Sequence, residues 1–108
     1  MNLKDKVVFI TGSSIGIGRA TAFEFAKERS KLIITYRSSK KEAEKVVRKC
    51  RELGSQNVLL LKLDVLDNDS IKNSVRQIKE RFGKIDILVN NAGYLVWTPL
   101  SKQTFEEI

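Results

Sequence analysis

Short apolar runs alternate with longer amphipathic stretches along this 108-residue chain, and this alternation restricts the possible folds more than any other feature. Continuous runs of branched apolar residues are typical of strands buried on both faces. The runs occupy residues 7–10, 32–34, 58–61 and 87–89. Between them, residues 16–29, 40–53 and 70–82 carry apolar side chains at spacings of three and four, as helices with one buried face do. The sequence therefore predicts the order β-α-β-α-β-α-β.

This order predicts a doubly wound α/β fold. A helix that crosses between two strands of one sheet almost always makes them parallel, through a right-handed connection. We therefore expect a twisted parallel sheet with helices on its faces, truncated to about half of a full domain. Asp67 is placed to cap the third helix, and Gly54 and Gly83 to end the second and third. Because no repeat or Pro/Gly/Ser-rich linker is present, residues 1–108 are expected to form one half-domain, with a loop over 91–103 and a helical turn over 104–108.

Composition excludes several classes of protein. The chain is 42% hydrophobic and 31% charged. It has no apolar run long enough to span a membrane and no apolar secretion signal. We therefore expect a cytoplasmic protein without a membrane partner. With Cys50 as the one cysteine and no histidine, an internal disulfide is excluded and a protein-built metal site is not expected. Cys50 lies among apolar helix positions, which favours packing over reactivity. The net charge of +7 is spread along the chain, so no nucleic-acid partner is expected.

A glycine-rich turn lies directly between the first predicted strand and the first predicted helix. Residues 11–18 read Thr-Gly-Ser-Ser-Ile-Gly-Ile-Gly. Glycines at such a turn let backbone N–H groups approach a pyrophosphate, and the helix N-terminus adds partial positive charge. The two serines can add hydroxyl donors, whereas a plain turn is the alternative interpretation. The predicted phosphate-binding residues are Gly12, Ser13, Ser14, Ile15, Gly16, Ile17 and Gly18.

Three motifs in order resemble those of the classical short-chain dehydrogenases/reductases. They are Gly12, Gly16 and Gly18; Asp64 and Val65; and Asn90, Asn91, Ala92 and Gly93. The chain resembles the N-terminal half of that family, and residues 36–38 with the following helix look most like its 3-oxoacyl-[acyl-carrier-protein] reductase and glucose 1-dehydrogenase branches. The resemblance implies a Rossmann-type NAD(P)-binding fold and hydride transfer between nicotinamide and a carbonyl or alcohol.

The later motifs have physical reasons beside the resemblance, which implies that Asp64 and Val65 contact the adenine. Asp64 follows the third strand, where ligands of open α/β sheets bind, and its carboxylate can accept a hydrogen bond from the adenine amine. The alternative is a solvated turn or helix-entry acid, a role shared with Asp67. Asn90 and Asn91 end the fourth strand and can tie strands together, while Gly93 admits the nicotinamide ribose.

Cofactor choice depends on the residues after the second strand. NAD-binding proteins commonly place an acid there for the ribose hydroxyls. Here Arg37 can pair with a 2′-phosphate and Ser38 can add a hydroxyl, so we predict NADP(H) as the preferred cofactor, with NAD(H) possible. Ile15 departs from the basic residue of many NADP-using relatives, and a solvated role for Arg37 stays open.

Catalytic residues are not expected in this chain. The family's catalytic Ser, Tyr and Lys, with an Asn, are implied to lie beyond residue 108. Tyr36 and Lys40 have the Tyr-Lys spacing by chance, because they leave the second strand on the adenosine side, and Tyr94 has Thr98 at that offset. We therefore expect the chain alone to be inactive, with the apolar edge of its fourth strand covered by self-association or by a C-terminal complementing half. A stand-alone dinucleotide-binding module is the alternative.

Overall fold

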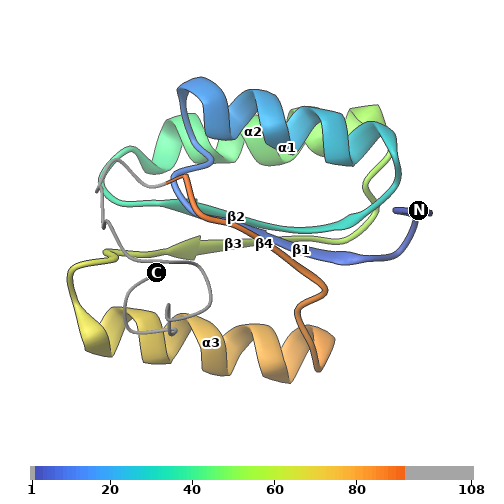
Figure 1. Ribbon diagram of the computed structural model, residues 1–108. Helices are drawn as coiled ribbons and strands as arrows, with labels where there is room; N and C mark the ends of the chain where they lie inside the picture. The colour runs from blue at the N-terminus through green and yellow to red at the C-terminus, as the bar shows by residue number, and fades with distance from the viewer. Residues whose placement is uncertain (1, 92–108) are drawn as a thin grey trace.

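The computed structural model describes residues 2–91, which form a three-layer α/β structure (Figure 1). The elements are β1 (Val7–Ile10), α1 (Gly16–Lys27), β2 (Lys31–Tyr36), α2 (Lys40–Leu53), β3 (Val58–Lys62), α3 (Asn68–Phe82) and β4 (Ile87–Val89). The four strands form one sheet in the order β3-β2-β1-β4, and all pairs are parallel. Helices α1 and α2 cover one face and α3 covers the other. The predicted truncated, doubly wound, Rossmann-type fold is confirmed.

Two apolar clusters, one on each face of the sheet, form the core. Under α1 and α2, side chains such as Val8, Ile10 and Ile34 pack with Ala22, Ala26 and Val46. Under α3, alternate strand residues such as Val7 and Ile33 pack with Ile71 and Ile78. Alternation along each strand sends neighbouring side chains to opposite faces, which is why continuous apolar runs mark strands buried on both sides.

Several predicted boundaries differ from those in the structure. Helix α1 ends at Lys27 because Arg29 adopts a left-handed φ of 63° and the Ser30 N–H donates back to the Phe25 carbonyl oxygen, a helix stop made without glycine. Strand β2 extends to Tyr36 because its last two residues pair with β3. Helix α3 begins at Asn68, directly after its predicted cap Asp67.

The short strand β4 is held against β1 at both of its ends. The Asp86 carboxylate accepts from the Val7 N–H at 2.8 Å, and the Thr11 N–H donates to the Val89 carbonyl oxygen at 3.0 Å. The hydrogen bond from Val7 lowers the pKa of Asp86, with a further contribution from Lys84. This double attachment fixes where the chain leaves β4 and enters Asn90 and Asn91.

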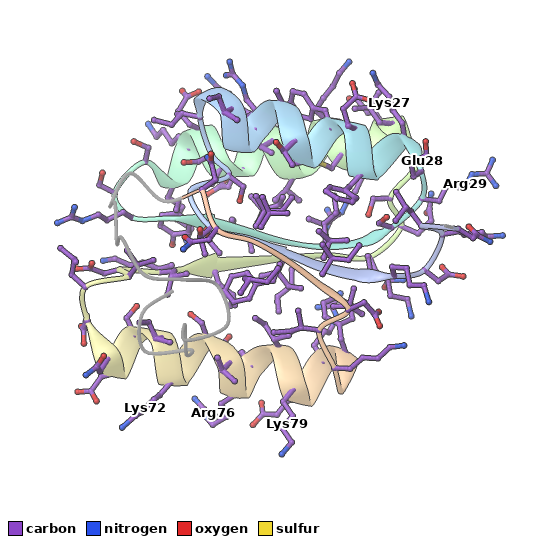
Figure 2. The ribbon with its side chains drawn as sticks, viewed as in Figure 1. Lys27, Glu28, Arg29, Lys72, Arg76 and Lys79 are labelled. Carbon is purple, nitrogen blue, oxygen red and sulfur yellow. The ribbon has the colours of Figure 1, made fainter. Side chains whose placement is uncertain are left out.

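Other sequence expectations concern single features of the described residues. Cys50 is buried on α2, and burial raises the pKa of its thiol to about 12, as packing rather than reactivity would give. Within residues 2–91, no helix has the length and apolar character to cross a membrane, and no His/Cys/Asp/Glu group could hold a metal ion. Basic side chains of α3, including Lys72, Arg76 and Lys79, point away from the sheet (Figure 2).

Candidate functional site

The main cleft lies where the carboxyl ends of the strands meet. It has a volume of about 520 Å³, within the range of small-molecule sites. Strands β2 and β4 lie on opposite sides of β1, so the chain changes its direction across the sheet at β1. Open α/β sheets bind ligands beside such a reversal, and the cleft lies there. Its lining residues are Gly12, Ser14, Ile15, Gly16, Ile17, Thr35, Tyr36, Arg37, Ser38, Ser39, Leu63, Asp64, Val65, Leu66 and Asn91.

The glycine turn between β1 and α1 forms one wall of this cleft. Gly12 and Gly16 have φ values of 61° and 58°, a left-handed conformation that disfavours side chains. Gly18 is needed for space instead: a Cβ atom there would lie 2.2 Å from the Gly12 carbonyl oxygen and 2.6 Å from Asn91 Nδ2. This tight turn therefore requires glycine at all three positions.

Helix α1 starts at the cleft without a side-chain cap. Its N-cap residue is Ile15, which makes no side-chain hydrogen bond, and its first turn contains no acidic residue. The first intrahelical bond runs from the Arg19 N–H to the Ile15 carbonyl oxygen, so the N–H groups of Gly16–Gly18 have no intrahelical acceptor. The start of α1 therefore offers backbone donors and partial positive charge to the cleft.

The two serines of the turn have different surroundings. Ser14 lines the cleft, although most of its surface is buried. The Ser13 side chain is completely buried, and its hydroxyl donates to the Ile10 carbonyl oxygen. Its hydroxyl therefore faces the fold rather than the cleft, where we had expected a phosphate contact. Thr35 of β2 contacts this turn and lines the cleft, and no local signal in the sequence predicts either role.

Residues 36–39 form the second wall, directly after the paired part of β2. Arg37 and Ser38, the residues predicted to bind the 2′-phosphate, line the cleft together with Tyr36 and Ser39, which were not predicted to do so. Arg37 is exposed, and no ion pair to it is present in the described part of the chain. The guanidinium can therefore meet an anion without first giving up an acidic partner.

The turn after β3 closes the cleft. Asp64 and Val65 both line it, as predicted, and Leu66 adds an apolar side chain that is 58% exposed. One carboxylate oxygen of Asp64, Oδ1, accepts from the Leu66 N–H at 3.0 Å. Asp64 thus has the turn role that was considered as its alternative, and it still borders the cleft where the ligand role requires it.

The two asparagines after β4 are anchored to the glycine turn. The Thr11 hydroxyl lies 3.2 Å from Asn90 Oδ1 and accepts from the Asn91 N–H at 2.8 Å. The Asn91 side-chain amide donates to the Gly12 carbonyl oxygen at 3.4 Å, and Asn91 lines the cleft. The predicted strand-tying role of these amides is therefore visible, while Ala92 and Gly93 lie outside the described residues.

The chain matches one known protein family over almost its whole length. The family model for short chain dehydrogenases matches residues 6–108. The chain belongs to this family. The predicted resemblance is therefore confirmed at the level of the family, a family of oxidoreductases that bind NAD(P).

Curated relatives of this short-chain dehydrogenase chain include several enzymes named for steroids. It is 41% identical over 103 residues to 17-beta-hydroxysteroid dehydrogenase 13 of Mus musculus, covering 95% of this chain and 33% of that protein. It is 41% identical over 109 residues to estradiol 17-beta-dehydrogenase 11 of Rattus norvegicus, covering 94% of this chain and 36% of that protein. The chain spans about a third of the length of these relatives.

Solved structures of the family have the same fold. A short-chain dehydrogenase/reductase double mutant from Serratia marcescens superposes with a TM-score of 0.80 at 36% identity, covering 99% of this chain and 43% of that chain. A second short-chain dehydrogenase/reductase, from Burkholderia xenovorans, gives a TM-score of 0.79 at 33% identity over 87% of this chain and 38% of that chain. The described cleft therefore belongs to a short-chain dehydrogenase fold.

Proposed function

We propose that this chain binds NADP(H) in the cleft, as the cofactor-binding portion of an oxidoreductase that transfers hydride between nicotinamide and a carbonyl or alcohol substrate. The phosphates lie against the glycine turn and the start of α1, and the adenine lies near Asp64 and Val65. We assign the nicotinamide ribose to Asn91, which lines the cleft, and, from the sequence motif alone, to Ala92 and Gly93, which are outside the described residues. The curated relatives are named as dehydrogenases of hydroxysteroids, which fits hydride transfer at an alcohol.

One observation carries this proposal: Arg37 and the uncapped start of α1 line the same cleft. A dinucleotide with a 2′-phosphate carries negative charge at two places, the pyrophosphate and the ribose. The helix start offers N–H donors to the first and the guanidinium offers charge-assisted hydrogen bonds to the second. Asp64 is the one acid among the lining residues, and it lies on the turn after β3 rather than beside Arg37 in the sequence. NADP(H) is therefore favoured over NAD(H).

The cofactor preference is tested by replacing Arg37. Charge-assisted hydrogen bonds contribute about 1.5–3 kcal/mol, so Arg37→Asp should weaken NADPH binding by about ten- to a hundredfold or more. NADH lacks the 2′-phosphate, and its binding should change much less. Titration of both cofactors by calorimetry measures the two dissociation constants.

A matched control separates this effect from a general loss of positive charge. Arg48 is an exposed arginine on α2 that does not line the cleft. Arg48→Asp changes the net charge equally and should leave both dissociation constants nearly unchanged. Equal losses of NADPH and NADH affinity in Arg37→Asp would contradict the assignment of NADP(H).

We further propose that the chain alone does not catalyse carbonyl reduction, and that β4 pairs with a complementing half or a second copy. Support comes from β4 itself, which is one of the two edge strands of the described sheet and carries the half-buried Ile87, Leu88 and Val89. Carbonyl-dependent oxidation of NADPH by the purified chain would contradict the first part. A monomeric mass in solution would contradict self-association. A stand-alone binding module, the second candidate, would bind NADPH as a stable monomer without turnover.

A further inference from the structure

Two buried hydroxyl groups join the glycine turn to the end of β2. The Ser13 hydroxyl donates to the Ile10 carbonyl oxygen at 2.9 Å and accepts from the Thr35 N–H at 2.8 Å. The Thr35 hydroxyl donates to the same carbonyl oxygen at 3.1 Å and accepts from the Gly12 N–H at 3.0 Å. Both side chains are almost inaccessible to solvent. Each hydroxyl therefore uses a donor and an acceptor inside the protein, which no apolar side chain can do.

This pair continues the attachment of β1 to β2 beyond the backbone ladder. The β1–β2 register ends with Ile10 opposite Ile34. At the next position the Thr35 N–H bonds to the Ser13 side chain rather than to a strand carbonyl. The separation of the two segments at this point therefore depends on two specific side chains, whereas along the strands it depends on the repeating backbone.

The pair lies at the base of both walls of the cleft. On one side, Gly12 and Ser13 lead into residues 14–17, which line the wall proposed to hold the phosphates. On the other, Thr35 leads directly into Tyr36 and Arg37, the wall proposed to hold the ribose 2′-phosphate. A ligand that bridges both walls needs them at a fixed separation, while a ligand that uses one wall does not.

We propose that Ser13 and Thr35 are positioning residues that hold the phosphate wall and the ribose wall at the separation a whole dinucleotide requires. This inference rests on the proposed function. Their hydroxyls are engaged inside the protein and do not contact the cofactor. They act by preorganising the cleft, so that binding does not have to order the two walls against each other.

The test compares a ligand that bridges the walls with one that does not. NADPH is the bridging ligand. Adenosine 2′-monophosphate is the other, because it lacks the pyrophosphate and does not reach the phosphate wall. Thr35→Val keeps the shape of the side chain and removes both of its hydrogen bonds. It should raise the NADPH dissociation constant about tenfold and that of adenosine 2′-monophosphate less than about twofold. Thr35→Ser restores the hydroxyl and should restore NADPH binding to within about twofold of the wild-type protein.

Two further variants keep the result specific. Ser55 is a buried serine whose hydroxyl donates to the Ser30 carbonyl oxygen at 2.6 Å, near the start of β3 and away from the cleft. Ser55→Ala should lower the Tm and leave both dissociation constants unchanged. Ser13→Ala removes the two hydrogen bonds of the Ser13 hydroxyl and should cause the same selective loss of NADPH binding. This variant tests the proposal even if Thr35→Val does not fold.

The outcomes separate this inference from the proposed function. The positioning role is overturned if Thr35→Val and Ser13→Ala weaken the binding of both ligands equally, or weaken the binding of neither. The proposed function still stands in that case, provided that the wild-type protein binds both ligands. A loss of NADPH affinity in Ser55→Ala as large as in Thr35→Val overturns it too, because the effect would follow from stability alone. A wild-type protein that binds neither ligand overturns the proposed function and this inference with it.

Discussion

Helices α1 and α3 both start at the carboxyl edge of the sheet, but only one of them is capped by its own sequence. The Asp67 carboxylate accepts from the Asp69 N–H at 3.0 Å and the Ser70 N–H at 3.4 Å, and Asp69 adds a second acid in the first turn of α3. At the same place in α1 stands Ile15, whose side chain is 60% exposed and bonds to nothing. The two helix starts thus differ in which group satisfies their N–H donors.

The difference indicates where an anionic ligand can be held. A carboxylate at the start of α3 already occupies the donors and balances the positive end of the helix. At α1 the donors and the partial charge are left to a group that is not part of the described chain. The backbone geometry is not the cause, because Ile15 has φ −144° and ψ 164°, the extended conformation of an ordinary cap residue. The residue type alone distinguishes the two starts.

The largest effect is expected from a substitution that destroys the geometry of the α1 start. A Cβ on Gly18 would lie 2.2 Å from a backbone oxygen that cannot rotate away. Gly18→Ala should therefore lower the free energy of unfolding by about 3 kcal/mol, as overpacking of a rigid site does, and abolish NADPH binding. Urea unfolding and calorimetric titration measure the two effects.

Gly83 at the end of α3 provides the matched control. It has a φ of 78°, but a Cβ there would meet nothing within 4 Å. Gly83→Ala should cost only about 1 kcal/mol, from the left-handed backbone, and leave NADPH binding intact. If the two alanine variants were equally stable, the close approach at Gly18 would not be what requires glycine there.

The start of α3 could be predicted from the sequence, and the layout of the fold largely could, because those signals are local. Asp67 is an acid directly before a helical pattern, and continuous apolar runs identify strands whichever partner they take. The end of α1 could not be predicted in the same way, since Arg29 adopts the left-handed conformation normally marked by glycine. The length of β2 depends on its pairing with β3, which is set in space and not along the chain.

The site residues also differ in whether a local signal in the sequence identifies them. The glycine turn, Arg37 and Asp64 could be found from the sequence because each follows a predicted strand and carries a residue type suited to a ligand contact. Thr35 and Leu66 do not, since nothing local shows that one contacts the glycine turn or that the other borders the cleft. The prediction for the Ser13 hydroxyl differs from its position in the structure for the same reason: whether a hydroxyl faces a ligand or a neighbouring strand depends on the segment packed against it.

One substitution gives α1 a side-chain cap like that of α3. Ile15→Asp places a carboxylate at an N-cap position that already has the required backbone conformation. The new cap should raise the free energy of unfolding by about 1 kcal/mol, while its charge and its use of the free donors should weaken NADPH binding by more than about tenfold. Increased stability with reduced binding in one variant is the expected signature, measured by urea unfolding and calorimetry.

Ile15→Asn separates the two causes of that loss. Asparagine caps a helix about as well as aspartate but brings no charge. If occupation of the N–H donors is sufficient, both variants lose affinity. If charge repulsion dominates, the asparagine variant binds NADPH nearly as the wild-type protein does. Unchanged NADPH binding in both variants would mean that the phosphates do not lie at the start of α1.

The smallest expected effect comes from removing the cap of α3. Asp67→Ala leaves two N–H groups without their acceptor and should lower the free energy of unfolding by about 1 kcal/mol, with no change in the NADPH dissociation constant, because Asp67 does not line the cleft. Asp69→Ala is the control: it removes an equal charge from the same turn without removing the cap, and should cost less than about 0.5 kcal/mol. A fall in NADPH affinity in Asp67→Ala alone would mean that the two helix starts are coupled through the turn that contains Asp64. The division of roles between a self-capped helix and a ligand-binding helix would then not hold.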